Sequence, residues 1–154
     1  MVLLLLIRAG GGMGIASVLL ILLGTQWYIL FNVIAGAMAL PADLQEAAVI
    51  FRFSTFTRWR LLILPGIFPY LVTGLVTASG GAWNASVVAE YFRLKGQTFS
   101  TTGLGAIISR ATDAGNFRML LAATIVMAIV VVATHRLLWH RLFEMAHSRF
   151  KLES

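Results

Sequence analysis

The stretch GIASVLLILLGTQWYILFNVIAGAM, residues 14–38, contains no charged side chain and decides the class of the protein. A helix needs about 20 apolar residues to cross the hydrocarbon core of a bilayer, and this stretch is longer. Pro41 follows it and ends the predicted helix, because proline cannot continue the backbone hydrogen-bond ladder. Among all 154 residues, 59% are hydrophobic and 12% are charged, which is too little charge to cover a soluble domain. We therefore expect an integral membrane protein.

Two further apolar runs are predicted to span the membrane, at residues 61–83 and 118–139. In the second of them only residues 119–134 are free of charged side chains, which is short for a span. Arg136 is therefore expected to extend its side chain so that its charge reaches the membrane interface. The fold class is thus all-α, a polytopic transmembrane helical bundle in which residues 1–154 form a single domain. The apolar residues 2–7 resemble the last turns of another membrane helix, so we expect the domain to be incomplete at its N-terminus.

The sequence also excludes several kinds of chemistry. There is no cysteine, so no disulfide, thiolate nucleophile or cysteine metal site is expected. No G-x-x-x-x-G-K-[ST] string occurs, so we expect no ATPase site in this chain. The three histidines, His135, His140 and His147, are not spaced to share one ion on a helix. We expect no catalytic residue, no metal and no cofactor, and the net charge of +6 predicts basic cytoplasmic loops rather than nucleic-acid binding.

Lysine and arginine counts predict the orientation in the membrane. Seven of these residues lie in the segment 41–60 and in the basic tail, which is counted as residues 140–154 together with Arg136. Four lie in the stretch 84–117 together with Arg118. We therefore expect segment 41–60 and the C-terminus to be cytoplasmic and the stretch 84–117 to be extracytoplasmic. The tail is expected to contact lipid headgroups.

The polar segment 41–60 has the pattern of a short amphipathic helix rather than of a minimal turn. Asp43 is predicted to cap it, and Glu46 three residues later to complete a capping box. Four apolar residues follow the i, i+3, i+4, i+7 spacing of one helical face, namely Leu44, Ala47, Ala48 and Phe51. Ser54 or Thr55 is predicted to cap a second turn. From the pattern alone, the helix either lies among lipid headgroups or docks into a groove of a partner protein.

Residues 46–65, EAAVIFRFSTFTRWRLLILP, resemble the cytoplasmic loop of ABC importer permeases of the binding-protein-dependent kind. That loop carries E-A-A, then a glycine four residues after the second alanine, and nine residues later I-x-L-P. Here Leu62, Leu64 and Pro65 stand at the matching offsets of the second part, and Arg52 replaces the glycine. The resemblance covers about residues 14–145, and its finer features are similar to the nitrate/sulfonate/taurine class of these permeases.

The resemblance implies a bacterial inner-membrane, multi-pass permease subunit that moves a small solute across the bilayer. Its partners would be a separate ABC ATPase subunit, an extracytoplasmic substrate-binding protein and a second permease copy or half. Because Arg52 replaces glycine, we expect the turn to be looser or shifted toward Ser54. The residues expected to couple the chain to the ATPase are Glu46, Ala47, Ala48, Phe51, Arg52, Arg58, Arg60, Leu64 and Pro65.

Polar residues in and near the spans are candidates for the translocation path. For Gln26 and Asn32 the alternative role is a hydrogen bond between helices, and we favour this alternative over a role in the path. For the residues placed after the second span, the alternative is a solvated or interfacial stretch; these are Asn84, Ser86 and Glu90. Two other functions remain open, a secondary transporter or channel fragment and a small membrane assembly protein without transport activity, and the motif at 46–65 argues against both.

Overall fold

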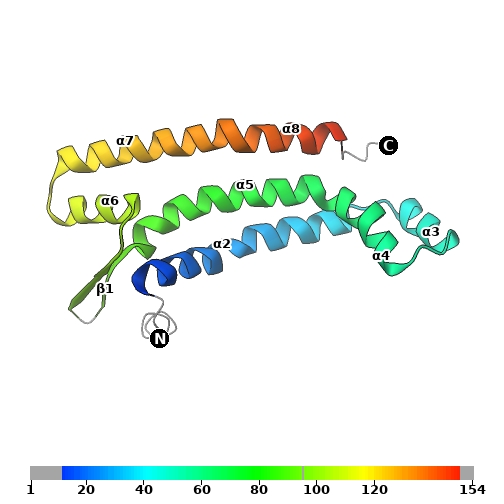
Figure 1. Cartoon of the computed structure of the whole chain (residues 1–154), viewed down its shortest axis with the longest axis horizontal. Helices are drawn as coiled ribbons and strands as arrows, with labels where there is room; N and C mark the ends of the chain where they lie inside the picture. Colours follow the sequence, from blue (N-terminus) through cyan, green and yellow to red (C-terminus); the bar gives the residue numbers. More distant parts are fainter. Residues whose placement is uncertain (1–11, 95, 150–154) are drawn as a thin grey trace. The chain divides into compact units, whose positions relative to one another are not determined.

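The computed structural model describes residues 12–94 and 96–149. The helix end predicted at residues 2–7 and the last part of the predicted tail, residues 150–154, lie outside this range. The described elements in chain order are α2 (Gly12–Met38), α3 (Ala42–Ile50), α4 (Thr55–Arg58), the π-helix η2 (Trp59–Ile63), α5 (Leu64–Ala89), β1 (Tyr91–Leu94), β2 (Gln97–Ser100), α6 (Leu104–Asp113), α7 (Phe117–Thr134), the π-helix η3 (His135–Trp139) and α8 (His140–Arg149) (Figure 1).

Three continuous helical stretches in the described part are long and apolar enough to cross a membrane, as predicted. They are Gly12–Met38, Thr55–Ala89 and Phe117–Ala146. The second and third run further than the sequence indicated. Helix α5 continues to Ala89, so Asn84 and Ser86 lie inside it rather than after it. The third stretch continues through η3 into α8, so helix also covers the start of the predicted tail.

One β-hairpin interrupts the otherwise helical structure between α5 and α6. Strands β1 and β2 pair antiparallel, with Phe92 opposite Phe99, and these two rings stack with their centroids 5.2 Å apart. Gly96 lies between the strands with φ +79°, a conformation that glycine adopts without steric cost. The sequence reading assigned no strand to the stretch 84–117, so the hairpin is an addition to the predicted all-helical fold.

The chain divides into two compact units. The described part of the first unit comprises residues 12–26, 78–94 and 96–134. Within it α6 packs against α7 and against β1. Gly105 of α6 lies so close to the backbone of Ser86 and Val87 in α5 that a Cβ atom would overlap it. The buried side chains of α6 are small, Ala106 and Ala111, which permits this close packing.

The described part of the second unit comprises residues 27–77 and 135–149. Here the second half of α2 packs closely against the first half of α5, because glycine stands at the contact on each helix. A Cβ atom on Gly36 would lie 2.8 Å from the Tyr70 side chain, and one on Gly74 would lie 3.0 Å from Asn32 Cβ and from Ile29 Cα. Helices α3 and α4 extend beyond this helix pair (Figure 1).

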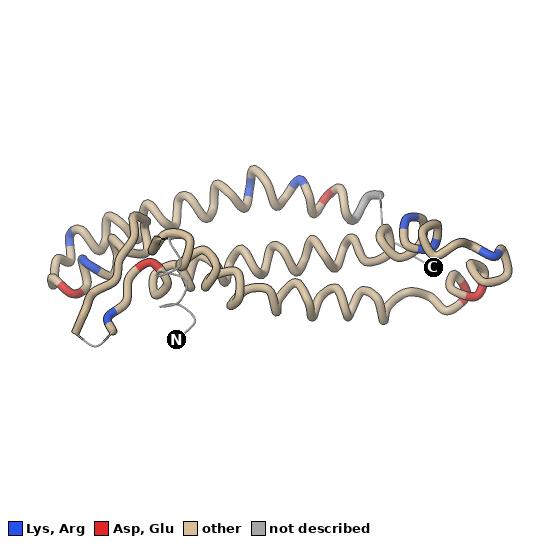
Figure 2. The backbone as a smooth tube through the Cα atoms, turned by 60° about the horizontal axis from the view of Figure 1, so that its bottom comes forward, with Lys and Arg blue, Asp and Glu red and all other residues tan. Residues whose placement is uncertain are grey.

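The large apolar side chains of the spans are mostly exposed. Within the described residues none of the large side chains is completely buried, and the buried apolar residues are mainly alanines. Trp27 and Phe31 on α2 and Leu121 and Ile129 on α7 are examples of exposed large residues. No charged residue interrupts the length of α2, whereas the last helical stretch carries charges along η3 and α8 (Figure 2). Such a surface is stable in lipid and not in water.

Candidate functional site

Helix α3 starts differently from the prediction. It begins at Ala42, Pro41 occupies the N-cap position, and no side chain caps it. The predicted capping box of Asp43 and Glu46 is therefore wrong. Proline has a fixed φ that suits a helix start, so the helix begins directly after it and Asp43 falls within the first turn. There its negative charge still complements the positive end of the helix dipole.

The end of α3 is a Schellman motif centred on Arg52. The Arg52 N–H donates to the Val49 carbonyl at 2.9 Å, and the Phe53 N–H donates to the Ala48 carbonyl at 3.0 Å. These two bonds satisfy the last carbonyls of the helix. Arg52 has φ +51°, the left-handed conformation, and among the described residues it is the one non-glycine residue with positive φ. The expectation of a looser or displaced turn was wrong: the turn forms at residue 52 itself.

Helix α4 begins at Thr55, after the four residues 51–54, and is capped as predicted. The Ser54 side chain accepts a hydrogen bond from the Thr57 N–H at 3.2 Å, and its hydroxyl also bonds the Thr57 hydroxyl at 2.8 Å. The widened turn η2 then leads into α5. This turn precedes Pro65, whose ring would clash with the carbonyl of Leu61 in a regular α-helix. The segment is therefore a fixed helix–turn–helix leading into the second span.

The outer surface of this segment is more apolar than the predicted helical face. Ala48 is buried, but Phe51 lies just outside α3 and is 72% exposed. Val49 and Ile50, which do not belong to the predicted face, are also exposed, and Ile50 reaches 76%. We define the coupling surface as the exposed side chains of residues 43–60, which include Val49, Ile50, Phe51, Phe53 and Phe56. The exposed apolar area therefore gathers around the turn rather than along one stripe of α3.

The charged groups of the coupling surface have no partner in the described part of the chain. Glu46, Arg52 and Arg60 are exposed, and none of their side chains makes a hydrogen bond or ion pair there. Arg58 is half-buried, and its Nε atom is buried without a hydrogen-bond partner. A buried donor without a partner costs free energy. At the start of α5, Leu64 is exposed and Pro65 is half-buried.

The polar residues of α2 lie as follows. Asn32 donates from Nδ2 to the Tyr28 carbonyl of its own helix at 2.7 Å. The interhelical hydrogen bond that we favoured for Asn32 does not form, because the amide satisfies the backbone one turn away while its Cβ packs at Gly74. Gln26 is exposed on the same helix and has no hydrogen-bond partner among the described residues.

Of the polar side chains near the end of α5, that of Glu90 bonds to another element of the first unit. The Ser86 hydroxyl donates to the Trp83 carbonyl at 2.8 Å within α5, whereas Asn84 is exposed. Glu90 accepts a hydrogen bond from the Ala106 N–H at 3.0 Å. This places a carboxylate on the N-terminus of α6, where backbone N–H groups and the helix dipole favour negative charge.

A polar cluster that the sequence reading missed ties the hairpin to α6. Tyr91 donates from its hydroxyl to Asp113 at 2.6 Å, and Arg93 forms a 2.8 Å ion pair with the same carboxylate. Two contacts raise the pKa of Arg93. The larger effect comes from its hydrogen bond with the Tyr91 side chain, and the smaller one from the negative charge of Asp113. Arg110 adds a hydrogen bond to the Thr101 carbonyl at 3.1 Å. Tyr91 and Asp113 are 22 residues apart, so no local pattern could have revealed the contact.

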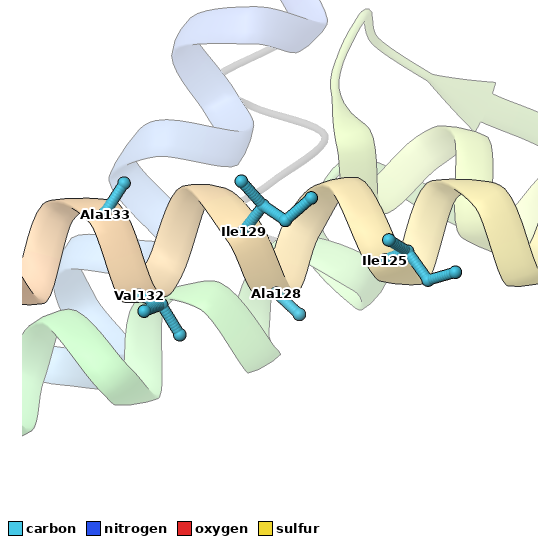
Figure 3. A pocket seen from close by; sticks show the side chains of 5 residues that line it. All are labelled: Ile125, Ala128, Ile129, Val132 and Ala133. Atoms are coloured by element: carbon cyan, nitrogen blue, oxygen red, sulfur yellow. The ribbon is translucent and has the colours of Figure 1, made fainter.

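Helix α7 carries an open groove without any chemistry of its own. Ile125, Ala128, Ile129, Val132 and Ala133 line it, all apolar and all from this one helix (Figure 3). Such a lining suits an acyl chain or another apolar helix. In the ranges that the structure describes, no three His, Asp or Glu side chains come close enough together to hold a metal ion.

Comparison with known proteins gives one family match that covers most of the chain. The family described as binding-protein-dependent transport system inner membrane component matches residues 1–144.

Curated proteins give partial matches. The chain is 28% identical over 115 residues to the nitrate import permease protein NrtB of Leptolyngbya laminosa, which is 75% of this chain and 39% of that protein. It is 33% identical over 75 residues to the bicarbonate transport system permease protein CmpB of Synechococcus elongatus, which is 49% of this chain and 27% of that protein. The matched part of this chain thus spans well under half the length of these relatives.

Proposed function

The chain belongs to the family of binding-protein-dependent transport system inner membrane components, and from that membership we propose that it forms part of the translocation path of an ATP-driven importer. It is a multi-pass component of the inner membrane, and its family is that of the permease component, which has no ATPase site of its own. ATP would be used by a separate ABC ATPase subunit, and an extracytoplasmic binding protein would deliver the solute.

The coupling surface is proposed as the docking site for the ATPase subunit. The observation that carries this proposal is the geometry of residues 42–63, where two short helices joined by a defined turn lead directly into a membrane span. A rigid element of this kind transmits a displacement at its outer end to the helix that follows it. Its exposed aromatic side chains and unpaired charges are the groups that protein interfaces use for anchoring and for orientation.

The transported solute is proposed to be a small inorganic anion. Support comes from the two kinds of relatives, which are described as permeases for nitrate and for bicarbonate. Gln26, Asn32, Asn84, Ser86 and Glu90 remain the proposed polar groups of the path. The structure gives Ser86 and Glu90 packing and capping contacts as well, so a path role would have to coexist with these contacts.

The remaining parts of the assembly follow from the same proposal. Residues 41–60 and 140–154 would face the cytoplasm, and residues 84–117 the extracytoplasmic side, in accordance with the distribution of basic residues. The exposed apolar faces of α2 and α7, including the groove in Figure 3, would contact membrane lipids and a second permease copy or half. A closed path between helices needs such additional helices, because α2 and α7 leave their large side chains uncovered.

Co-purification with an ABC ATPase subunit of the same organism tests the proposal. The full chain is co-expressed with that ATPase as wild type, as Glu46→Arg and as Ala48→Trp, and the amount of ATPase retained on the purified chain is measured. We expect wild type to retain the ATPase and both variants to lose most of it, because one reverses a charge and the other overfills the buried Ala48 position. Equal retention by all three would exclude the coupling surface as the docking site.

A further inference from the structure

The backbone of Arg52 is held in a conformation that a non-glycine residue adopts at a cost. Its φ of +51° is fixed by the two hydrogen bonds of the Schellman motif, at 2.9 and 3.0 Å. Glycine occupies this conformation without penalty, whereas a residue with a Cβ atom is sterically disfavoured there. The local fold does not need the arginine side chain, since that side chain makes no hydrogen bond or ion pair with any described residue.

The two sequence neighbours of Arg52 are exposed aromatic residues. Phe51 precedes it and is largely exposed, and Phe53 follows it with 40% of its surface exposed. The two rings contact each other, with their centroids 6.3 Å apart, and Arg52 lies between them in the sequence, at the turn. Arginine flanked by aromatic residues is typical of the energetically dominant positions of protein interfaces.

We propose that Arg52 determines which ATPase this chain accepts, by pairing with a carboxylate on the ATPase surface. This inference rests on the proposed docking of the coupling surface. The planar guanidinium binds a carboxylate through two parallel hydrogen bonds, and the rigid turn holds it ready for that contact. An ATPase without an acidic side chain opposite residue 52 would leave the guanidinium desolvated and unpaired, which disfavours the wrong partner.

A protein carboxylate is favoured over a lipid phosphate by the charges of the same segment. Helix α3 carries two exposed acidic residues, Asp43 and Glu46, and no basic residue, whereas Arg52, Arg58 and Arg60 follow it in the same segment. A helix that binds anionic headgroups carries lysine and arginine on its polar face, and acidic residues there would be repelled. Mixed charges of both signs around an apolar centre instead match the complementary pattern of a protein partner.

A cross-linking experiment tests the contact directly. Arg52→Lys places an amine at the turn, and a zero-length carbodiimide joins an amine only to a carboxylate that touches it. Background is low, because the chain has just two native lysines, Lys95 and Lys151. The full chain in nanodiscs is incubated with an ABC ATPase subunit of the same organism, cross-linked and analysed by mass spectrometry. We expect a bond from residue 52 to one aspartate or glutamate of the ATPase, and none from the control Arg118→Lys.

Affinity measurements give the second readout. Arg52→Gly keeps the turn, so the variant folds, and we expect about tenfold weaker binding of the ATPase, as for a close interfacial charge pair. Arg52→Lys keeps the charge but loses the second hydrogen bond of the guanidinium fork, so its affinity should lie between those of wild type and Arg52→Gly. The measurements are made in nanodiscs of pure phosphatidylcholine and in nanodiscs containing phosphatidylglycerol. A loss on Arg52→Gly that is equal in both lipids supports the carboxylate contact.

Several results would overturn the inference. If Arg52→Gly weakens binding only when phosphatidylglycerol is present, the partner of Arg52 is a lipid headgroup. If wild type binds the ATPase and Arg52→Gly binds it equally well, residue 52 does not determine the partner, while the docking proposal survives. If wild type itself does not bind, the docking proposal fails and this inference fails with it.

Discussion

Arg52 is the residue at which local strain and proposed function meet. The Schellman motif requires a left-handed residue after α3, and the chain places an arginine there at φ +51°. Strain of this kind persists where the surrounding hydrogen bonds fix the conformation. The sequence identifies residue 52 as the turn position by its place in the motif at residues 46–65. An arginine there gives no local signal that its backbone will adopt the left-handed conformation that glycine favours.

Replacing Arg52 by glycine should stabilise the isolated chain. We expect Arg52→Gly to raise the free energy of unfolding by about 1 kcal/mol, because it removes the left-handed penalty. The matched control is Arg60→Gly in η2, where the backbone is right-handed and glycine should cost about 1 kcal/mol. Thermal unfolding in detergent measures both, with opposite shifts of Tm. A loss of stability in Arg52→Gly would show that the side chain stabilises the fold.

Glu90 should contribute to stability through the N-terminus of α6. We expect Glu90→Ala to lower the free energy of unfolding by about 1 kcal/mol, since it removes both an acceptor for the Ala106 N–H and a negative charge at the positive helix end. Glu90→Gln keeps an acceptor and should lose less. Glu46→Ala, an exposed glutamate without a described partner, is the control and should stay within about 0.5 kcal/mol of wild type. Equal effects at both sites would contradict the capping role.

At the scale of elements, the contact between α2 and α5 depends on glycine. A Cβ atom at Gly36 would lie 2.8 Å from Tyr70, so Gly36→Ala forces one helix to move, which typically costs about 1–3 kcal/mol. Gly24 lies in the same helix with nothing within 4 Å of a Cβ atom. Gly24→Ala should therefore be neutral or gain up to about 1 kcal/mol from helix propensity. Thermal unfolding of the two variants in the same detergent compares them, and a lower Tm for Gly24→Ala than for Gly36→Ala would exclude this packing.

The sequence predicts the elements that depend on composition and misses those that depend on distant contacts. The three spans can be predicted from the gaps between charged residues. The predicted ends differ from the observed ends where the helix continues past a polar residue, as at Asn84. The Ser54 cap follows from local chemistry. The hairpin is missed because each strand has four residues, although Gly96 between two short runs was an available signal. The Glu90 cap and the Tyr91–Asp113 bond join residues 16 and 22 apart, which no local pattern encodes.

At the scale of the whole molecule, the distribution of basic residues predicts one orientation in the membrane. The chain has no cysteine, so single cysteines report sidedness without background. We expect Thr98→Cys on β2 to react with a membrane-impermeant maleimide in spheroplasts. Ala42→Cys, exposed at the start of α3, should react only after the membrane is permeabilised. The reverse labelling pattern would invert the orientation and place the coupling surface outside the cell.

Hydrogen exchange of the full chain in nanodiscs, with and without an ABC ATPase subunit of the same organism, tests the central claim most directly. The backbone amides of residues 42–60 lie in short helices and an exposed turn, so they should exchange quickly in the free chain. The account predicts that the ATPase slows exchange in residues 42–60 and leaves the hairpin at residues 91–100 unchanged. Protection of the hairpin, or unchanged exchange in residues 42–60 while the ATPase is bound, would contradict it.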